Sequence, residues 1–99
     1  MPKIYEYFGF VFAFFVKDHL PVHVHVSKQQ RESKIELHFT KNGLKLIGKE
    51  VRGRLPLKKS ELKEAKDFVN HYHVEIVNKW TEVMVYNKKV SCEIIREKI

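Results

Sequence analysis

A pair of histidines one residue apart is the part of this chain best suited to chemistry. His23 and His25 alternate with three valines over residues 22–26. Side chains two residues apart on a β-strand point the same way, so the valines would face a core and the imidazoles the opposite side. Imidazole titrates near neutral pH and also binds transition metals. The pair could therefore serve as general acid and base or as metal ligands.

A second alternating segment brings further polar groups toward this pair. Residues 34–39 place Glu36 and His38 on one side of a strand and apolar side chains on the other. If this strand pairs with the first as an antiparallel hairpin with matching faces, Glu36 and His38 become cross-strand neighbours of His23 and His25. The hairpin would then gather imidazole and carboxylate groups on one face of a sheet.

Three interpretations of this face stay open. Catalysis would use His23 and His25 at the scissile bond of an RNA, one taking the 2′-hydroxyl proton and the other protonating the leaving oxygen, with Glu36 and His38 in support. Metal binding would use His23, His25 and either His38 or Glu36 to hold a divalent ion such as zinc. The third interpretation, which the residues alone favour, makes them ordinary polar groups on a solvated face or a cross-strand hydrogen-bonded group. His19, just before the first strand, could reach the same area.

Positive charge is concentrated in the middle third of the chain. The formal net charge is +7, and residues 41–66 hold nine Lys or Arg against three Glu. Such a segment is typical of proteins that contact the phosphates of RNA or DNA, and a solvated lysine-rich face is the plain alternative. The candidate nucleic-acid contacts are Lys45, Lys49, Arg52, Arg54, Lys58 and Lys59.

The elements that must position these groups predict one α+β domain over residues 1–99. Apolar and alternating runs predict a mainly antiparallel sheet of about four strands, at residues 3–7, 10–16, 22–27 and 34–39, with 44–51 as a further candidate. Ser60 is a good N-cap, and apolar residues recur at three- and four-residue steps from there to Val83. This spacing predicts one long helix packed on one face of the sheet. The tail could form a terminal hairpin from residues 83–86 and 90–94.

Two features point to a cytoplasmic protein without membrane association. Cys92 is the only cysteine, so no internal disulfide can form, which suits a reducing compartment. The longest apolar run, residues 8–16, is far short of the ~20 residues needed to span a bilayer.

Several short motifs occur here in the order of a known bacterial family. They are Met1-Pro2-Lys3-Ile4, Gly9-Phe10, His23-Val24-His25-Val26 and Lys79-Trp80. In these motifs the chain resembles the domain of unknown function 4160 family. Val22 stands where that family has the second proline of a Pro-Pro-His-x-His-Val core. The similarity covers residues 1–84, and residues 85–99 look like a C-terminal extension.

The resemblance implies a small prokaryotic, cytoplasmic protein with no assigned activity. Such domains look like members of two-gene modules of the toxin–antitoxin kind, which would supply a cognate small partner protein. A family motif at His23 and His25 moves weight from the solvated-face interpretation toward a function. With the basic segment, it leads to the hypothesis of an RNA-interacting protein of toxin–antitoxin type, a histidine-dependent ribonuclease in its sharpest form. The alternatives are a metal-binding protein and a non-enzymatic module that binds a partner or pairs as a homodimer.

Overall fold

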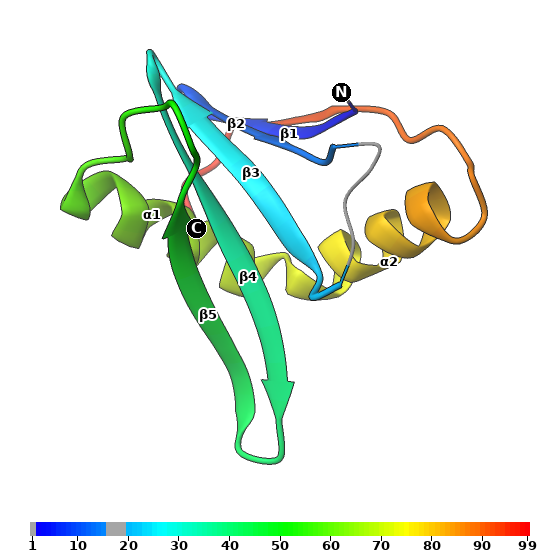
Figure 1. The fold of residues 1–99 in the computed structure, drawn as a ribbon. Helices are drawn as coiled ribbons and strands as arrows, with labels where there is room; N and C mark the ends of the chain where they lie inside the picture. The colour runs from blue at the N-terminus through cyan, green and yellow to red at the C-terminus, as the bar shows by residue number, and fades with distance from the viewer. Residues whose placement is uncertain (1, 16–19) are drawn as a thin grey trace.

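The computed structural model describes residues 2–15 and 20–99, which form a sheet with helices packed on one of its faces (Figure 1). The predicted α+β class is confirmed. Along the chain the elements are β1 (Lys3–Tyr7), β2 (Phe10–Ala13), β3 (His23–Lys28), β4 (Arg31–Thr40), β5 (Gly43–Glu50), α1 (Lys59–His71), α2 (His73–Met84) and β6 (Glu93–Ile95).

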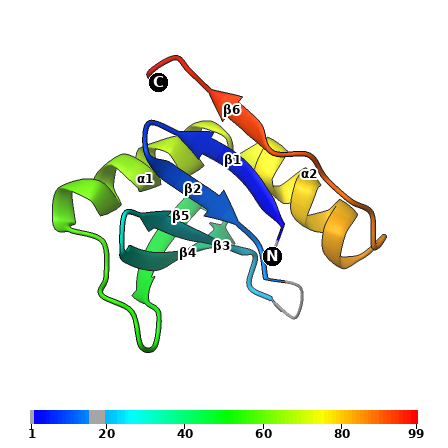
Figure 2. The ribbon, with the colours of Figure 1, turned by 90° about the horizontal axis from the view of Figure 1, so that it is seen from above.

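The sheet has six strands in the order β5-β4-β3-β2-β1-β6, not about four. Neighbours from β1 to β5 pair antiparallel, and the further candidate at residues 44–51 is present as β5. The predicted terminal hairpin is wrong, because Val83 and Met84 end α2 and β6 instead pairs parallel with β1. An edge strand with unpaired backbone groups can accept another strand, and β6 covers the edge of β1 in this way. Figure 2 shows β6 alongside β1.

The predicted single helix is two helices that meet at Tyr72. Tyr72 leaves helical geometry, with φ −105° and ψ 18°. The ring of His73 donates from Nδ1 to the carbonyl of Asn70 at 2.7 Å, so a side chain occupies an acceptor that the backbone of an unbroken helix would use. The start also differs from the prediction, because Lys58 and not Ser60 is the N-cap, and its N–H donates to Glu61 at 2.9 Å.

Aromatic side chains fill the layer between the sheet and the helices. Phe68 of α1 is fully buried, and its ring lies 4.4 Å from Phe12 and 4.6 Å from Tyr7, measured between centroids. Farther along, Trp80 of α2 packs edge-on against Phe14 at 5.4 Å. Truncating a buried Phe to Ala typically costs about 3–5 kcal/mol, so this layer supplies much of the stability that holds the sheet in shape.

β4 is longer than the sequence suggested, and β3 is shifted by one residue toward the C-terminus. The polar loop expected at residues 28–33 is a tight turn, because β3 extends to Lys28 and β4 begins at Arg31. Gln29 adopts a positive φ of 57° in this turn. The predicted strand at 10–16 ends at Ala13, and Val16 and His19 lie outside the described residues.

Candidate functional site

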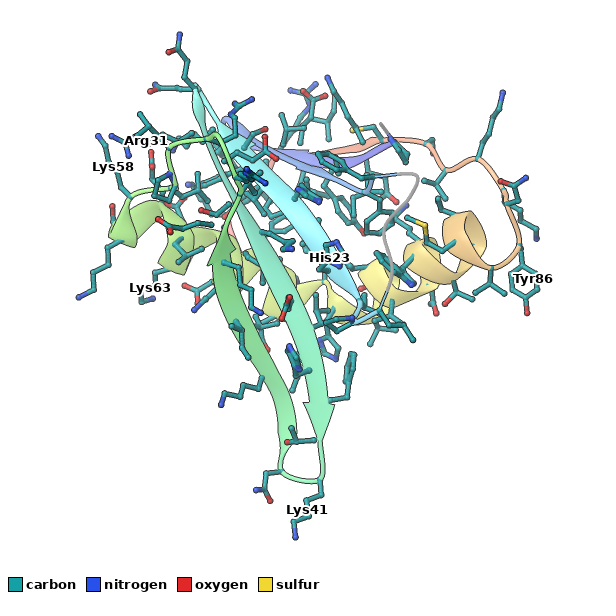
Figure 3. All side chains as sticks on the ribbon, viewed as in Figure 1. His23, Arg31, Lys41, Lys58, Lys63 and Tyr86 are labelled. Carbon is teal, nitrogen blue, oxygen red and sulfur yellow. The ribbon has the colours of Figure 1, made fainter. Side chains whose placement is uncertain are left out.

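The face of the sheet away from the helices, called here the helix-free face, carries the polar residues of β3 and β4. In the register of these strands His23 lies opposite Glu36, and Val24 lies opposite Ile35. Val24 and Ile35 are fully buried in the core under the helices. Alternation therefore places the imidazoles on the helix-free face, as predicted from the sequence. Figure 3 shows His23 near the end of β3 that approaches α2.

The histidine pair is buried, in contrast to the solvated face that the residues alone favoured. His23 and His25 are only 5% and 8% exposed. The ring of Phe15 stacks on His25 with 3.7 Å between centroids, and Trp80 lies 5.3 Å from His23. An apolar side chain from the end of β2 and another from α2 thus enclose groups that alternation assigns to the outer face.

Each histidine of the pair has a defined hydrogen-bond partner. His23 donates from Nδ1 to the carbonyl of Pro21 at 2.8 Å. His25 uses Nδ1 toward Glu32 Oε2 at 3.3 Å. The two rings lie 5.5 Å apart. Since a carbonyl oxygen can only accept, the hydrogen of His23 is on Nδ1, which fixes its ring orientation.

Two carboxylates of β4 each lie between an imidazole and a cation. Glu36 contacts His38 Nε2 at 2.9 Å and Lys49 Nζ at 3.5 Å, and its side chain is 10% exposed. Glu32, which contacts His25, also lies 3.7 Å from Arg54. The hydrogen bond from His38 lowers the pKa of Glu36, with help from the nearby ammonium of Lys49 and against the effect of burial. The carboxylate of Glu36 is therefore kept ionised.

The four residues predicted to act together lie on neighbouring strands but do not form a single cluster. Glu36 joins His23, its cross-strand neighbour, to His38, its hydrogen-bond partner. His25 instead lies opposite Lys34 and contacts Glu32, which the sequence analysis did not single out. Of the four, His38 is the accessible one, with a side chain 37% exposed.

Basic side chains face one another across β4 and β5 on the helix-free face. Lys34 lies directly opposite Lys49, and His38 lies directly opposite Lys45. These two pairs are called here the cationic rows, and Glu36 lies between them. Like charges directly opposite in a sheet are destabilising, so such rows favour an anion that bridges them. Lys34 was not among the residues singled out from the sequence, although it shares the strand parity of Glu36 and His38.

The other predicted nucleic-acid contacts lie on the segment that follows β5. Arg52 and Arg54 are exposed in the loop, and Lys58 and Lys59 are exposed where α1 begins. Figure 3 shows the labelled Lys58 far from Lys41 at the tip of the β4–β5 hairpin. The basic segment therefore runs from the cationic rows around the edge of the sheet, and only part of it lies on the helix-free face.

No three His, Cys, Asp or Glu side chains lie close enough to hold a metal ion within residues 2–15 and 20–99. The metal interpretation of His23, His25 and His38 or Glu36 stays a prediction, as does any role of His19.

No helix among the described residues is long and apolar enough to cross a membrane.

Comparison with known proteins adds the family. The family model described as "Domain of unknown function (DUF4160)" matches residues 9–81. No curated protein and no solved structure matches the chain. Because the matched residues are well over half of the sequence, the chain belongs to the DUF4160 family, as the motif around His23 predicted.

Proposed function

We propose that this member of the DUF4160 family binds single-stranded RNA through the cationic rows and the basic loop that follows β5. The observation that carries the proposal is the direct opposition of Lys34 to Lys49 and of His38 to Lys45. A phosphate between Lys34 and Lys49 removes the repulsion between their ammonium groups and gains two charge-assisted contacts. RNA is a better fit than a small anion because Arg52 and Arg54 continue the positive charge beyond the rows.

Charge balance on this part of the surface supports the proposal. Among the described residues, Lys45, Arg52, Lys58 and Lys59 form no ion pair with a carboxylate, whereas Lys49 lies 3.5 Å from Glu36 and Arg54 lies 3.7 Å from Glu32. By contrast, the cations Lys63, Lys79 and Lys98 each have a carboxylate within 3.3 Å, as follows from the pairs Lys63–Asp67, Lys79–Glu93 and Lys98–Glu64. Cations without a partner in the protein are the ones available to replace the counterions of a nucleic acid.

An anisotropy titration of labelled single-stranded RNA at two salt concentrations tests this function. We expect binding that weakens steeply with salt, and a salt dependence whose slope falls by about 0.7 for each phosphate contact removed. The variant Lys45→Glu/Lys49→Glu should bind more weakly than the wild type. The matched variant Lys88→Glu/Lys89→Glu, with the same charge change in the loop after α2, should not. Absence of binding at low salt would contradict the proposal.

Unlabelled DNA of the same sequence, used as a competitor against the labelled RNA, decides between the two nucleic acids. Competition by DNA at equal strength would mean that the rows read only the phosphates. Weaker competition would mean that the 2′-hydroxyl contributes to binding.

Cleavage of the bound RNA is the second candidate, and the Glu36–His38 pair favours it. The side chain of His38 is 37% exposed, and the carboxylate of Glu36 at 2.9 Å fixes the orientation of its ring. On this proposal, one imidazole takes the 2′-hydroxyl proton and a second protonates the leaving oxygen, as predicted for His23 and His25. Because those two rings are buried, the sequence-based roles require that they become accessible when RNA binds.

Single substitutions distinguish these roles. If His38 acts on the substrate, His38→Ala abolishes cleavage while RNA binding changes only a few-fold. His23→Ala and His25→Ala test the predicted catalytic pair, and circular dichroism of each variant separates loss of activity from loss of fold. The wild-type protein should not cleave an RNA with a 2′-deoxy substitution at the cleaved site, because that RNA lacks the attacking hydroxyl. If the wild type cleaves no RNA under conditions where it binds, the protein is a binding module and no nuclease.

A further inference from the structure

The outer edge of β5 is open along its whole length. β5 is the first strand of the sheet order, and its eight residues from Gly43 to Glu50 pair with β4 without a register shift. In the described part of the chain no strand pairs with its other side. The opposite edge is different, because β6 is only three residues long. Figure 1 shows that the β4–β5 hairpin also extends beyond the helices, so its edge is accessible.

A cavity of about 840 Å³ lies next to this edge on the helix side, lined by Lys59, Ser60, Leu62, Lys63 and Lys66 of α1. The position of Leu62 relates the cavity to the strand. A Cβ atom at Gly48 would lie 2.9 Å from Leu62, so Leu62 packs directly on the edge strand. Because Leu62 also lines the cavity, the cavity lies beside β5 on the helix side of the sheet. The helix-facing side chains of a seventh strand paired with β5 would point toward it.

The side chains along the edge specify what that strand must look like. On the helix-free face, an added strand would run beside Lys45 and Lys49. On the helix side, it would meet Leu44, Leu46 and Leu62, which are partly buried against the core. Because successive side chains of a strand alternate between the faces, the complementary sequence alternates acidic and apolar residues.

A second copy of this chain does not meet these requirements. Two β5 strands related by a twofold axis pair antiparallel, which sets the lysines at 45 and 49 of one copy against those of the other. Lysines on an edge strand are a common protection against self-pairing. The edge is therefore closed to a copy of itself and remains open to a strand that brings carboxylates.

We propose that the open edge of β5 and the adjacent cavity receive an extended segment of a partner protein, in which acidic and apolar residues alternate. The backbone of the segment would pair with β5, its carboxylates would lie beside Lys45 and Lys49, and its apolar side chains would fill the cavity under α1. If the RNA-binding function holds, the segment also competes with RNA for the same two lysines. That consequence rests on the proposed function, whereas the strand addition does not.

The test uses a fluorescent peptide in which Glu and Val alternate, matched in length to β5. Its control is the same peptide with an N-methyl group on every amide, which keeps the side chains and their charge but leaves no backbone N–H to donate to a strand. We expect the first peptide alone to bind and to slow amide hydrogen exchange in β5. Equal binding of both peptides, binding of neither, or unchanged exchange in β5 would overturn the proposal.

Variants separate edge pairing from general attraction between opposite charges. Lys45→Glu/Lys49→Glu should weaken binding of the first peptide about tenfold, since two exposed ion pairs are replaced by repulsion. Lys88→Glu/Lys89→Glu should leave it unchanged, and an equal loss in this control would overturn the proposal. Displacement of labelled RNA by the first peptide tests the competition. Peptide binding without RNA binding would refute the proposed function alone, and RNA binding without peptide binding would refute the partner strand alone.

Discussion

The helix-free face has two regions built from the same kind of residues, and they differ in almost every physical respect. Around His23 and His25 the polar groups are 5% and 8% exposed, covered by aromatic rings and hydrogen-bonded within the protein. In the cationic rows Lys45 and Lys49 are exposed and Lys34 is half-buried, and basic residues lie directly opposite basic residues. A buried polar group is costly unless it is hydrogen-bonded within the protein. An exposed polar group is hydrated and can bind a ligand instead. The residues of the most distinctive sequence motif, His23 and His25, are therefore less accessible to a ligand than the cationic rows.

The largest expected effect is on the buried region. His23→Ala removes a buried ring beside Trp80 and leaves the carbonyl of Pro21 without its donor. We expect the free energy of unfolding to fall by about 2–4 kcal/mol. Urea denaturation measures it, with Lys34→Ala of the cationic rows as the control that changes it by less than about 0.5 kcal/mol. A His23→Ala protein that is as stable as the wild type but has lost cleavage would show that the histidine pair serves catalysis and not stability.

The next effect is on the exposed region and concerns binding. Lys45→Glu/Lys49→Glu should lower RNA affinity by about 10- to 100-fold at low salt, because two phosphate contacts become repulsive. The thermal unfolding midpoint should stay within a few degrees of the wild-type value, since exposed substitutions rarely change stability by more than about 0.5 kcal/mol. Anisotropy and a thermal melt measure the two quantities. A fall in both RNA affinity and the unfolding midpoint would show that the cationic rows stabilise the fold.

A smaller effect lies at the boundary between the regions, where Glu36 joins them. The pKa of Glu36 is lowered in the folded protein, so its ionisation stabilises the fold above the unfolded-state pKa of about 4.3, and this contribution is lost as the pH falls through the folded value. Glu36→Gln should reduce the free energy of unfolding by about 1 kcal/mol at pH 7. The gap between the variant and the wild type should narrow as the pH falls below about 4. Urea titrations at several pH values measure it, and a constant gap would mean that packing and not charge is responsible.

The smallest effect tests whether the histidine region depends on its outermost contact. Arg54 lies 3.7 Å from Glu32, and its side chain is 45% exposed. Arg54→Ala should change the free energy of unfolding by less than about 0.5 kcal/mol, because exposed ion pairs contribute little. RNA affinity should fall a few-fold. A stability loss as large as that of His23→Ala would show that the buried region extends to the surface loop.

The helices and the tail show where prediction from the sequence reached its limit. The apolar stripe from Leu62 to Val83 correctly identified the residues that face the core, because a small bend at Tyr72 does not change which side chains point inward. The bend itself depends on the ring of His73 capturing a backbone carbonyl, which no periodicity reveals. The position of β6 beside β1 is likewise a pairing between distant segments, and three residues carry too little pattern to predict it.

The site divides in the same way. Alternation in the sequence was enough to place His23, His25, Glu36 and His38 on one face, and the register confirms this. It could not reveal that Glu32 and not Glu36 is the partner of His25, because diagonal contacts depend on the twist and stagger of the strands. Lys34 escaped notice for a related reason. It stands out only because Lys49, fifteen residues later in the chain, lies directly opposite it on β5.

By itself the sequence determined the fold class, the two faces of the central hairpin, the concentration of positive charge and the family. The first three follow from local periodicity and composition, which act on neighbours along the chain, and the family follows from the resemblance of short motifs such as the one around His23. Only the tertiary structure decided that the histidine pair is covered by Phe15 and Trp80. It also decided that Lys45 and Lys49 are exposed on β5, an edge strand of the sheet. Burial and edge position depend on which distant segments come to lie against a surface. That outcome is set by the packing of the whole chain, and no single segment encodes it.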